Sequence, residues 1–300
     1  LGSALDSLGL IDLSGADPDL PLPVADGGTG AATQAAALLN LGGHPLHGVP
    51  RNAAGGYDFT MSYNSGTRVL TLTPTGTSFD IWTLGTKRTF TGAQTFPAHA
   101  NATNGYFLYV AEDGTLTAGT TFWDLRRVAP IAYVFYNATL GIGIPFEERH
   151  TATRDPEWHI RTHSVDGTQL VSGLAPAGYT LRTDTLAGVT YSVGSGVIAD
   201  EDVQTTVSAL ADGGPYAIFW RTGASGVWGW TTTDTVPFKN NGTNLQWNQF
   251  TGGAWQLTAA ANGNYINYWL FAVPAFAAPY QIILVPGQAA HASLSAAQAE

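Results

Sequence analysis

The chain of 300 residues contains no cysteine and carries little charge. The absence of cysteine excludes disulfide bonds, thiolate metal ligands and cysteine nucleophiles together. Asp, Glu, Lys and Arg make up only 11% of the residues, against about a quarter in ordinary soluble domains. Because repulsion between like charges helps to keep proteins monomeric, this low charge favours a subunit that buries surface against copies of itself.

Positive charge is scarcer still, which limits the classes of partner. Lys and Arg total 12 against 22 Asp and Glu, so the net charge at pH 7 is −10. A surface that follows phosphates needs concentrated positive charge, and we therefore expect no nucleic-acid partner. No stretch reaches the roughly 18 apolar residues of a membrane span, so we expect no membrane insertion.

Neither a repeat of about 20–50 residues nor a long helical pattern occurs between residues 57 and 285. Short apolar or aromatic runs bounded by Gly, Asn or Pro are typical of strands separated by turns. The dipeptides Asp113-Gly114 and Asn241-Gly242 are turn signals. We therefore expect a mainly β fold, built as β-sandwich-like or interlocked β-sheet domains. The runs begin at Thr67, Phe79, Tyr106, Ile131, Tyr216, Tyr265 and Gln281.

The first fifty residues differ from the rest, with no aromatic residue before Tyr57. The stretch Asp17-Pro-Asp-Leu-Pro-Leu-Pro cannot be a central strand, because each proline lacks a backbone donor, and it predicts an extended linker. A short Ala-rich helix is expected over residues 31–41, ended by Gly42-Gly43. A helix of this length is marginal in water by itself, so packing against symmetry-related copies would explain it.

These patterns divide the chain into four segments. Residues 1–50 form an N-terminal segment that contains the short helix. Residues 51–130 form a β-rich domain, and residues 131–288 form a β-rich body that is also rich in tryptophan. Residues 289–300 are Ala-rich and form the start of a further element or a tail.

The segment from Val24 to Gly43 reads Val-Ala-Asp-Gly-Gly-Thr-Gly-Ala-Ala-Thr-Gln-Ala-Ala-Ala-Leu-Leu-Asn-Leu-Gly-Gly. It resembles a module of bacteriophage tail-fibre proteins, in which a Gly-Gly-Thr-Gly turn precedes an Ala-rich helical turn ending in Asn-Leu-Gly. Stretches such as Gly226-Val-Trp-Gly-Trp and Val285-Pro-Gly-Gln are similar to phage virion proteins without assigned catalytic residues. The resemblance implies a homotrimer exposed on the virion surface, with one end docked to the virion and the other facing the host. We expect residues 1–50 to be a virion-docking or shaft segment that binds other virion proteins.

Tryptophans gather between positions 220 and 269, which suits a host polysaccharide as partner. Aromatic faces stack on sugar rings, although Trp is equally a large core residue, and we expect about two thirds of these rings in the core or the trimer interface. The pair Trp228-Gly-Trp230 follows Gly226 and is the one expected on the surface. The candidate glycan-binding residues are Trp228, Trp230, Trp247 and Trp255.

Three histidines, His150, His159 and His163, lie in a stretch rich in Arg and carboxylates and are candidate metal ligands. On a strand, His159 and His163 would share a face roughly 13 Å apart, whereas on a helix they would converge. Trimeric phage fibres sometimes hold an ion on their axis with histidines from three chains, so the resemblance leaves an axial metal ion as the one candidate cofactor. An interface network of His, Arg and carboxylates is the favoured alternative, and Asp200-Glu-Asp202 is expected to be a solvated acidic turn.

No catalytic motif of the Gly-x-Ser-x-Gly, His-Glu-x-x-His or Walker type occurs, and we expect the chain not to be an enzyme. The expected function is that of a trimeric tail fibre or adhesin that attaches to host-surface glycan. A tailspike-type polysaccharide depolymerase is one alternative, since glycosidases need two carboxylates about 5–9.5 Å apart and this chain offers several. A purely architectural head fibre, collar or baseplate component is the other. The available carboxylates are Glu147, Glu148, Asp155, Glu157, Asp200, Glu201 and Asp202.

Overall fold

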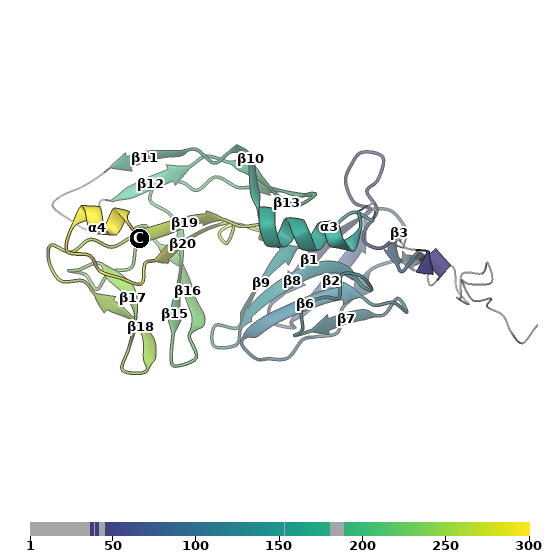
Figure 1. Cartoon of the computed structure of the whole chain (residues 1–300), viewed down its shortest axis with the longest axis horizontal. Coiled ribbons are helices and arrows are strands. Elements are labelled where there is room, and N and C mark those ends of the chain that lie inside the picture. The colour runs from purple at the N-terminus through teal and green to yellow at the C-terminus, as the bar shows by residue number, and fades with distance from the viewer. Residues whose placement is uncertain (1–36, 39, 42–45, 153, 181–188) are drawn as a thin grey trace, which may run out of the picture.

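The computed structural model describes residues 37–38, 40–41, 46–152, 154–180 and 189–300. This part is mainly β, as the sequence predicted, and its strands form several small sheets, none of which closes into a barrel. An N-terminal half and a C-terminal half lie side by side along the long axis of the molecule (Figure 1). Most of the helix expected over residues 31–41 lies outside the described residues, although residues 37, 38 and 40 are helical.

The N-terminal half contains three antiparallel sheets, which are ordered β1-β2-β5, β3-β4 and β7-β6-β8-β9. Each strand either coincides with one of the short apolar runs or pairs with a strand that does. The strands are β1 (Phe59–Asn64), β2 (Val69–Pro74), β3 (Ser78–Thr83), β4 (Thr86–Thr91), β5 (Gln94–Thr95), β6 (Asn104–Val110), β7 (Leu116–Gly119), β8 (Ala129–Asn137) and β9 (Ile142–Glu147).

Alternating side chains of these strands fill a common core, because successive residues of a strand point to opposite faces. Leu70 and Leu72 of β2 are both fully buried, so they share the core face of the strand. They pack with Phe79 and Ile81 of β3 and with residues of β6 and β8. Each such apolar side chain contributes about 1.5–3 kcal/mol when it is fully buried.

Strand β8 crosses the boundary expected at residues 130 and 131. It pairs with β6 on one side and with β9 on the other, so a single sheet extends from Asn104 to Glu147. The N-terminal half is therefore larger than the sequence suggested, because pairing between strands joined these segments across a proline at position 130.

The C-terminal half is organised around a four-stranded sheet, ordered β16-β15-β20-β19, in which β15 and β20 run parallel. Three smaller sheets, β10-β13-β14, β11-β12 and β17-β18, surround it. The strands are β10 (Gln169–Gly173), β11 (Pro176–Thr180), β12 (Thr190–Val193), β13 (Gly196–Asp200), β14 (Val203–Val207), β15 (Tyr216–Thr222), β16 (Val227–Asp234), β17 (Gln246–Thr251), β18 (Ala254–Ala259), β19 (Tyr268–Ala272) and β20 (Ile282–Pro286).

The two faces of the four-stranded sheet have different neighbours. Ile218 and Leu284 pack on one face against a core that includes Val193 and Ile198. Ala217 and Phe219 lie on the opposite face, where they pack near Ile144 of the N-terminal half. The second face therefore connects the two halves of the chain.

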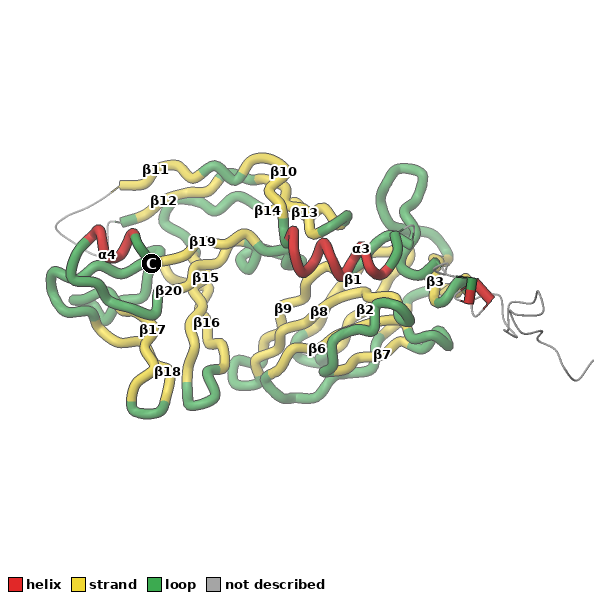
Figure 2. The backbone as a smooth tube through the Cα atoms, in the orientation of Figure 1, coloured by secondary structure: helices red, strands yellow, loops and turns green. Residues whose placement is uncertain are grey.

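Among the described residues after position 57, helical turns occur at two places. Helix α3 (Pro156–Arg161) continues directly into a π-helical segment, η2 (Thr162–Asp166), and helix α4 (Leu294–Gln298) lies in the Ala-rich C-terminal stretch. Figure 2 shows α3 at the junction of the two halves. None of the helices among the described residues has the length and apolar character needed to cross a membrane.

Candidate functional site

Helix α3 and its continuation η2 carry the candidate metal ligands His159 and His163 and set their relative positions. The Asp155 carboxylate caps the helix by accepting a hydrogen bond of 2.9 Å from the Trp158 backbone N–H. Pro156 occupies the first turn, where its missing N–H costs no hydrogen bond. His159 and His163 therefore lie on successive helical turns, and the helical geometry left open by the sequence is the one observed.

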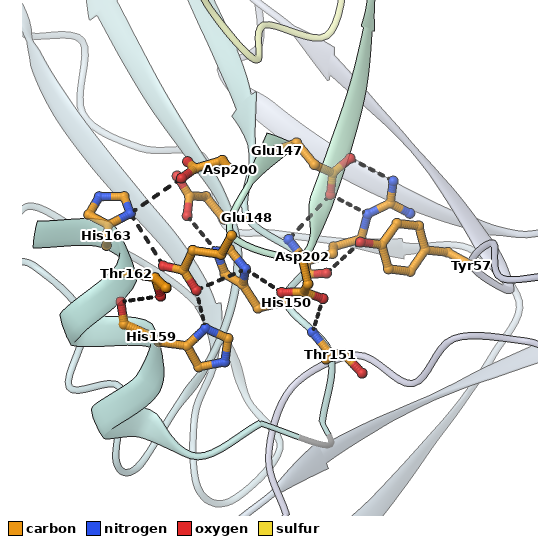
Figure 3. Close-up of polar contacts among 12 residues, drawn as sticks. Tyr57, Glu147, Glu148, His150, Thr151, His159, Thr162, His163, Asp200 and Asp202 are labelled. Atoms are coloured by element: carbon orange, nitrogen blue, oxygen red, sulfur yellow. Dashed lines mark hydrogen bonds and ion pairs between the residues drawn. The ribbon is translucent and has the colours of Figure 1, made fainter. Parts of the chain in front are cut away.

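His150 reaches the same place from the segment that follows β9. Its Nδ1 lies 3.0 Å from Oδ1 of Asp202, and its Nε2 lies 3.4 Å from Oε2 of Glu148. Figure 3 shows the His150 ring surrounded by carboxylates from both halves of the chain. The His150 and His159 ring centroids are 4.7 Å apart, so the structure brings these two sequence-predicted ligands together within one chain.

Glu201 lies at the tip of the two-residue turn between β13 and β14 and joins the histidines. Its Oε2 accepts a hydrogen bond from His159 and lies 3.6 Å from Nδ1 of His150, while its Oε1 lies 3.5 Å from Nδ1 of His163. The Glu201 side chain is only 2% exposed. Its backbone φ of 54° is in the left-handed region, which costs a residue with a side chain roughly 1–2 kcal/mol.

The turn Asp200-Glu-Asp202 is therefore not the solvated acidic turn that the sequence suggested. Asp200 is 7% exposed, and Asp202 accepts hydrogen bonds from His150 and from the Thr151 backbone N–H. No local pattern in the sequence marks this burial, because the partners lie some fifty residues earlier in the chain. We name the whole group, His150, His159, His163, Glu148, Asp200, Glu201 and Asp202, the His–carboxylate cluster.

Several side chains of the His–carboxylate cluster have pKa values shifted from their ordinary values. Burial disfavours a charge on His150, but hydrogen bonds with Asp202 and Glu148 outweigh it and raise the pKa to about 10. Burial likewise disfavours a charge on Glu201, but hydrogen bonds from His159 and His163 lower its pKa to about 2. Burial raises the pKa of Glu148 and of Asp200 above their ordinary values.

A small cavity of about 10 Å³ borders the cluster. Phe122, Trp123 and Leu125 form one side, and residues of the cluster form the other. Trp123 is 7% exposed, and its indole N–H has no hydrogen-bond acceptor among the described residues. A space of this size matches one water molecule or ion and is far too small for a sugar ring.

The other carboxylates named from the sequence serve separate local contacts. Glu147 accepts hydrogen bonds of 2.6 and 2.7 Å from the Arg149 guanidinium, which lies 3.8 Å from the ring centroid of Tyr57. Asp155 caps helix α3, and Glu157 forms an exposed ion pair with Arg126. None of these three contacts places a pair of carboxylates across an open cleft.

The predicted glycan-binding tryptophans divide into different environments. Trp228 and Trp255 are half-buried, and the Arg221 guanidinium carbon lies 5.0 Å from the Trp228 ring centroid and 5.7 Å from that of Trp255. Mutual backbone hydrogen bonds of 3.0 Å between Gly223 and Trp255 join β18 to the β15–β16 hairpin. We name Trp228, Arg221 and Trp255 the aromatic platform.

Gly226 allows the platform to form. Its φ is +67°, and a Cβ built at this position would lie 2.9 Å from the Trp255 ring. Any side chain here would therefore meet both backbone strain and the indole. Gly226 therefore makes room for Trp255.

Trp230 and Trp247 do not belong to the platform. Trp230 is 6% exposed and its ring stacks on Phe219 at 5.4 Å between centroids, so the expectation that Trp230 is displayed is corrected. Its strand packs against the N-terminal half, which the sequence did not indicate. Trp247 is half-buried and pairs with Thr258, whereas Phe250 pairs with Trp255, so alternation places Trp247 on the opposite face of that hairpin.

An apolar cleft of about 600 Å³ opens beside the platform. Trp228 and Phe219 line it from the C-terminal half, and Phe135 and Phe146 line it from the N-terminal half. Phe271 on β19 also lines the cleft, although it is 48% exposed. Aromatic surface is therefore continuous from this cleft to the platform through Trp228.

Comparisons with protein-family models, with curated proteins and with solved structures found no match for this chain.

Proposed function

We propose that the chain is a bacteriophage virion structural protein, a subunit of a trimeric tail fibre or adhesin that attaches to glycan on the host surface. The aromatic platform of Trp228, Arg221 and Trp255 carries this proposal. The likeness of residues 24–43 to a tail-fibre module supports the place on the virion. In this proposal the N-terminal segment binds other virion proteins, and no chemistry is performed on the glycan.

The platform has the chemistry that a neutral or acidic sugar needs. Two indole faces offer flat apolar surface for a sugar ring, and Arg221 offers several N–H donors in a planar fork for hydroxyl or carboxylate groups. Because Arg221 lies against both rings, its guanidinium is held in place before a ligand arrives. A shallow site of this kind binds weakly, and three copies in one fibre would strengthen attachment through multivalency.

Exposed aromatic residues on β19 support self-association. Trp269 and Phe271 are 45% and 48% exposed, and the register with Val285 and Ile283 places both on the face that borders the apolar cleft. Strand β19 is also an edge strand, since it pairs only with β20 in its sheet. Exposed edges and large apolar patches are liabilities unless a partner covers them, which a homotrimer would do.

The depolymerase alternative has less support from the carboxylates. Glu148 and Glu201 of the His–carboxylate cluster border a cavity of about 10 Å³, and Glu147, Asp155 and Glu157 form separate contacts. A glycosidase needs its two carboxyl groups on either side of a bound sugar, which this arrangement does not provide. The aromatic platform favours binding over cleavage.

Binding of the purified chain to host-cell polysaccharide tests the proposal, with release of reducing sugar measured in parallel. Trp228→Ala and Trp255→Ala should each abolish retention on the polysaccharide, whereas Trp247→Ala, on the other face of its hairpin, should preserve it. Retention that survives both platform substitutions, in chains of unchanged oligomeric mass, would favour the purely architectural role. Release of sugar fragments would favour the depolymerase.

A further inference from the structure

We propose that His150, His159, Glu201 and Asp202 bind one divalent transition-metal ion, zinc or a metal of similar preference, within a single chain. Each of the four side chains offers one ligand atom, and these atoms all lie within 4.8 Å of one another. The proposal goes beyond glycan attachment, because the aromatic platform contributes none of these ligands. It also differs from an axial ion shared by three chains.

The spacing of the ligand atoms suits a single ion. Ligands of a tetrahedral zinc ion lie about 2.0–2.2 Å from the metal and so about 3.3–3.6 Å from one another. Nδ1 of His150 lies 3.0 Å from Oδ1 of Asp202 and 3.6 Å from Oε2 of Glu201. Nδ1 of His159 contacts that same Glu201 oxygen, so small shifts of the side chains would centre an ion among all four.

The donor set also selects the class of metal. Two imidazoles with two carboxylates form a mixed nitrogen and oxygen set, which zinc and its first-row neighbours prefer, whereas calcium and magnesium prefer oxygen alone. The Thr151 backbone N–H donates to the second oxygen of Asp202 at 3.0 Å. Outer contacts of this kind orient metal ligands, and His163, 3.5 Å from the second oxygen of Glu201, provides another.

The small cavity and Trp123 are observations independent of the ligand spacing. The cavity of about 10 Å³ is lined by His150, His159 and Glu201, and by the buried indole of Trp123. The indole N–H has no acceptor among the described residues, and leaving a buried donor without a partner costs roughly 1–3 kcal/mol. A water molecule that fills the cavity beside the ion would accept this hydrogen bond.

An ion here would join two neighbouring segments to a turn that lies 42 residues or more further along the sequence. His150 follows β9, His159 lies on α3, and Glu201 with Asp202 forms the turn between β13 and β14. Binding of a metal to a site that exists only in the folded chain adds directly to folding free energy. The ion would therefore hold α3 and the β13–β14 turn against the N-terminal half.

Titration of the full, chelator-treated chain with Co²⁺ tests the proposal. The wild-type chain should bind one Co²⁺ per chain, with the visible absorption bands of a four-coordinate ion that disappear when Zn²⁺ displaces it. Zn²⁺ should also raise the midpoint of thermal unfolding. His159→Gln and Glu201→Gln should each weaken Co²⁺ binding at least about tenfold, since even outer-shell changes have effects of that size.

Two variants serve as matched controls. Glu157→Gln alters an exposed carboxylate on the same helix, and His291→Gln alters a histidine that pairs with Glu300; both should bind Co²⁺ like the wild type. The proposal fails if the wild-type chain shows no stoichiometric Co²⁺ spectrum, a result that does not depend on whether a variant folds. It fails equally if a folded Glu201→Gln chain binds Co²⁺ as tightly as the wild type.

Discussion

Glu201 accepts a hydrogen bond from His159 although the two residues lie 42 positions apart, and Glu201 adopts a left-handed backbone conformation at the tip of its turn. Turns between adjacent strands with a positive φ at this position favour glycine. A buried carboxylate thus occupies a place where the local backbone would prefer no side chain. The contacts with the histidines offset that local cost.

The local cost of Glu201 can be measured with two substitutions. Glu201→Ala and Glu201→Gly both remove the carboxylate, but only alanine retains a Cβ at a φ of 54°. We expect the alanine variant to be less stable than the glycine variant by about 1 kcal/mol. Urea unfolding in the presence of chelator measures the difference, and equal stabilities would contradict the assignment of strain.

Stability and ligand binding should separate between two neighbouring tryptophans. Trp230 is buried against Phe219, so Trp230→Ala should lower the free energy of unfolding by about 3–5 kcal/mol. Trp255 is half-buried on the platform, and Trp255→Ala should lower it by much less while removing glycan retention. Chemical denaturation of both variants measures the two free energies of unfolding. A similar loss of unfolding free energy in the two variants would mean that Trp255 belongs to the core.

Removal of metal should leave the oligomer intact. All four proposed ligands come from one chain, so a chelator should lower the midpoint of thermal unfolding without dissociating the proposed trimer. Light scattering with and without chelator measures the mass, which we expect near that of three chains in both conditions. Dissociation by chelator would instead indicate ligands shared between chains.

The ion pair between Glu147 and Arg149 should contribute substantially to stability. The two side chains are 15% and 10% exposed, and the Arg149 guanidinium also donates to the Phe59 carbonyl at 2.6 Å. Glu147→Gln leaves that cation without its partner, and we expect a loss of about 2 kcal/mol, below the range for a fully buried pair. Glu157→Gln at the exposed pair with Arg126 should change the unfolding free energy by less than about 1 kcal/mol.

His99 should remain neutral below the pH at which an exposed histidine gains a proton. The Tyr63 hydroxyl donates to its Nε2 at 2.7 Å, and its Nδ1–H donates to the Ala100 carbonyl at 3.0 Å. Burial lowers the pKa of His99 below its ordinary value of 6.5. The stability that His99 contributes is therefore complete above pH 6.5 and is lost as the pH falls through 6.5 toward the folded-state pKa.

A pH titration of the His99 ring by NMR measures this pKa directly. Tyr63→Phe removes the hydroxyl that donates to the ring and should shift the pKa of His99 upward, because the neutral form loses a hydrogen bond. The shift should be absent in Tyr109→Phe, because Tyr109 forms neither of the hydrogen bonds described for the His99 ring. A wild-type pKa at or above 6.5 would contradict the prediction.

The β character of this chain could be predicted from its sequence because strand patterns are local. Leu70 and Leu72 alternate with polar residues and proved fully buried on one face, and Gly114 and Gly242 take the positive φ of the predicted turns. Each of these features depends on neighbours within a few residues. Alternation and turn chemistry were therefore sufficient to place them.

The His–carboxylate cluster and the aromatic platform depend on long-range packing, which no local sequence pattern predicts. His150 and His159 share Glu201 as a partner only because the β13–β14 turn, with Glu201 at its tip, lies against helix α3. Trp230 entered the core because its face of the sheet meets the N-terminal half, whereas Trp255 remained beside Arg221. The sequence alone therefore determined where the strands and turns form. The packing of the sheets decided which side chains contact one another, because this packing depends on segments that lie far apart in the chain.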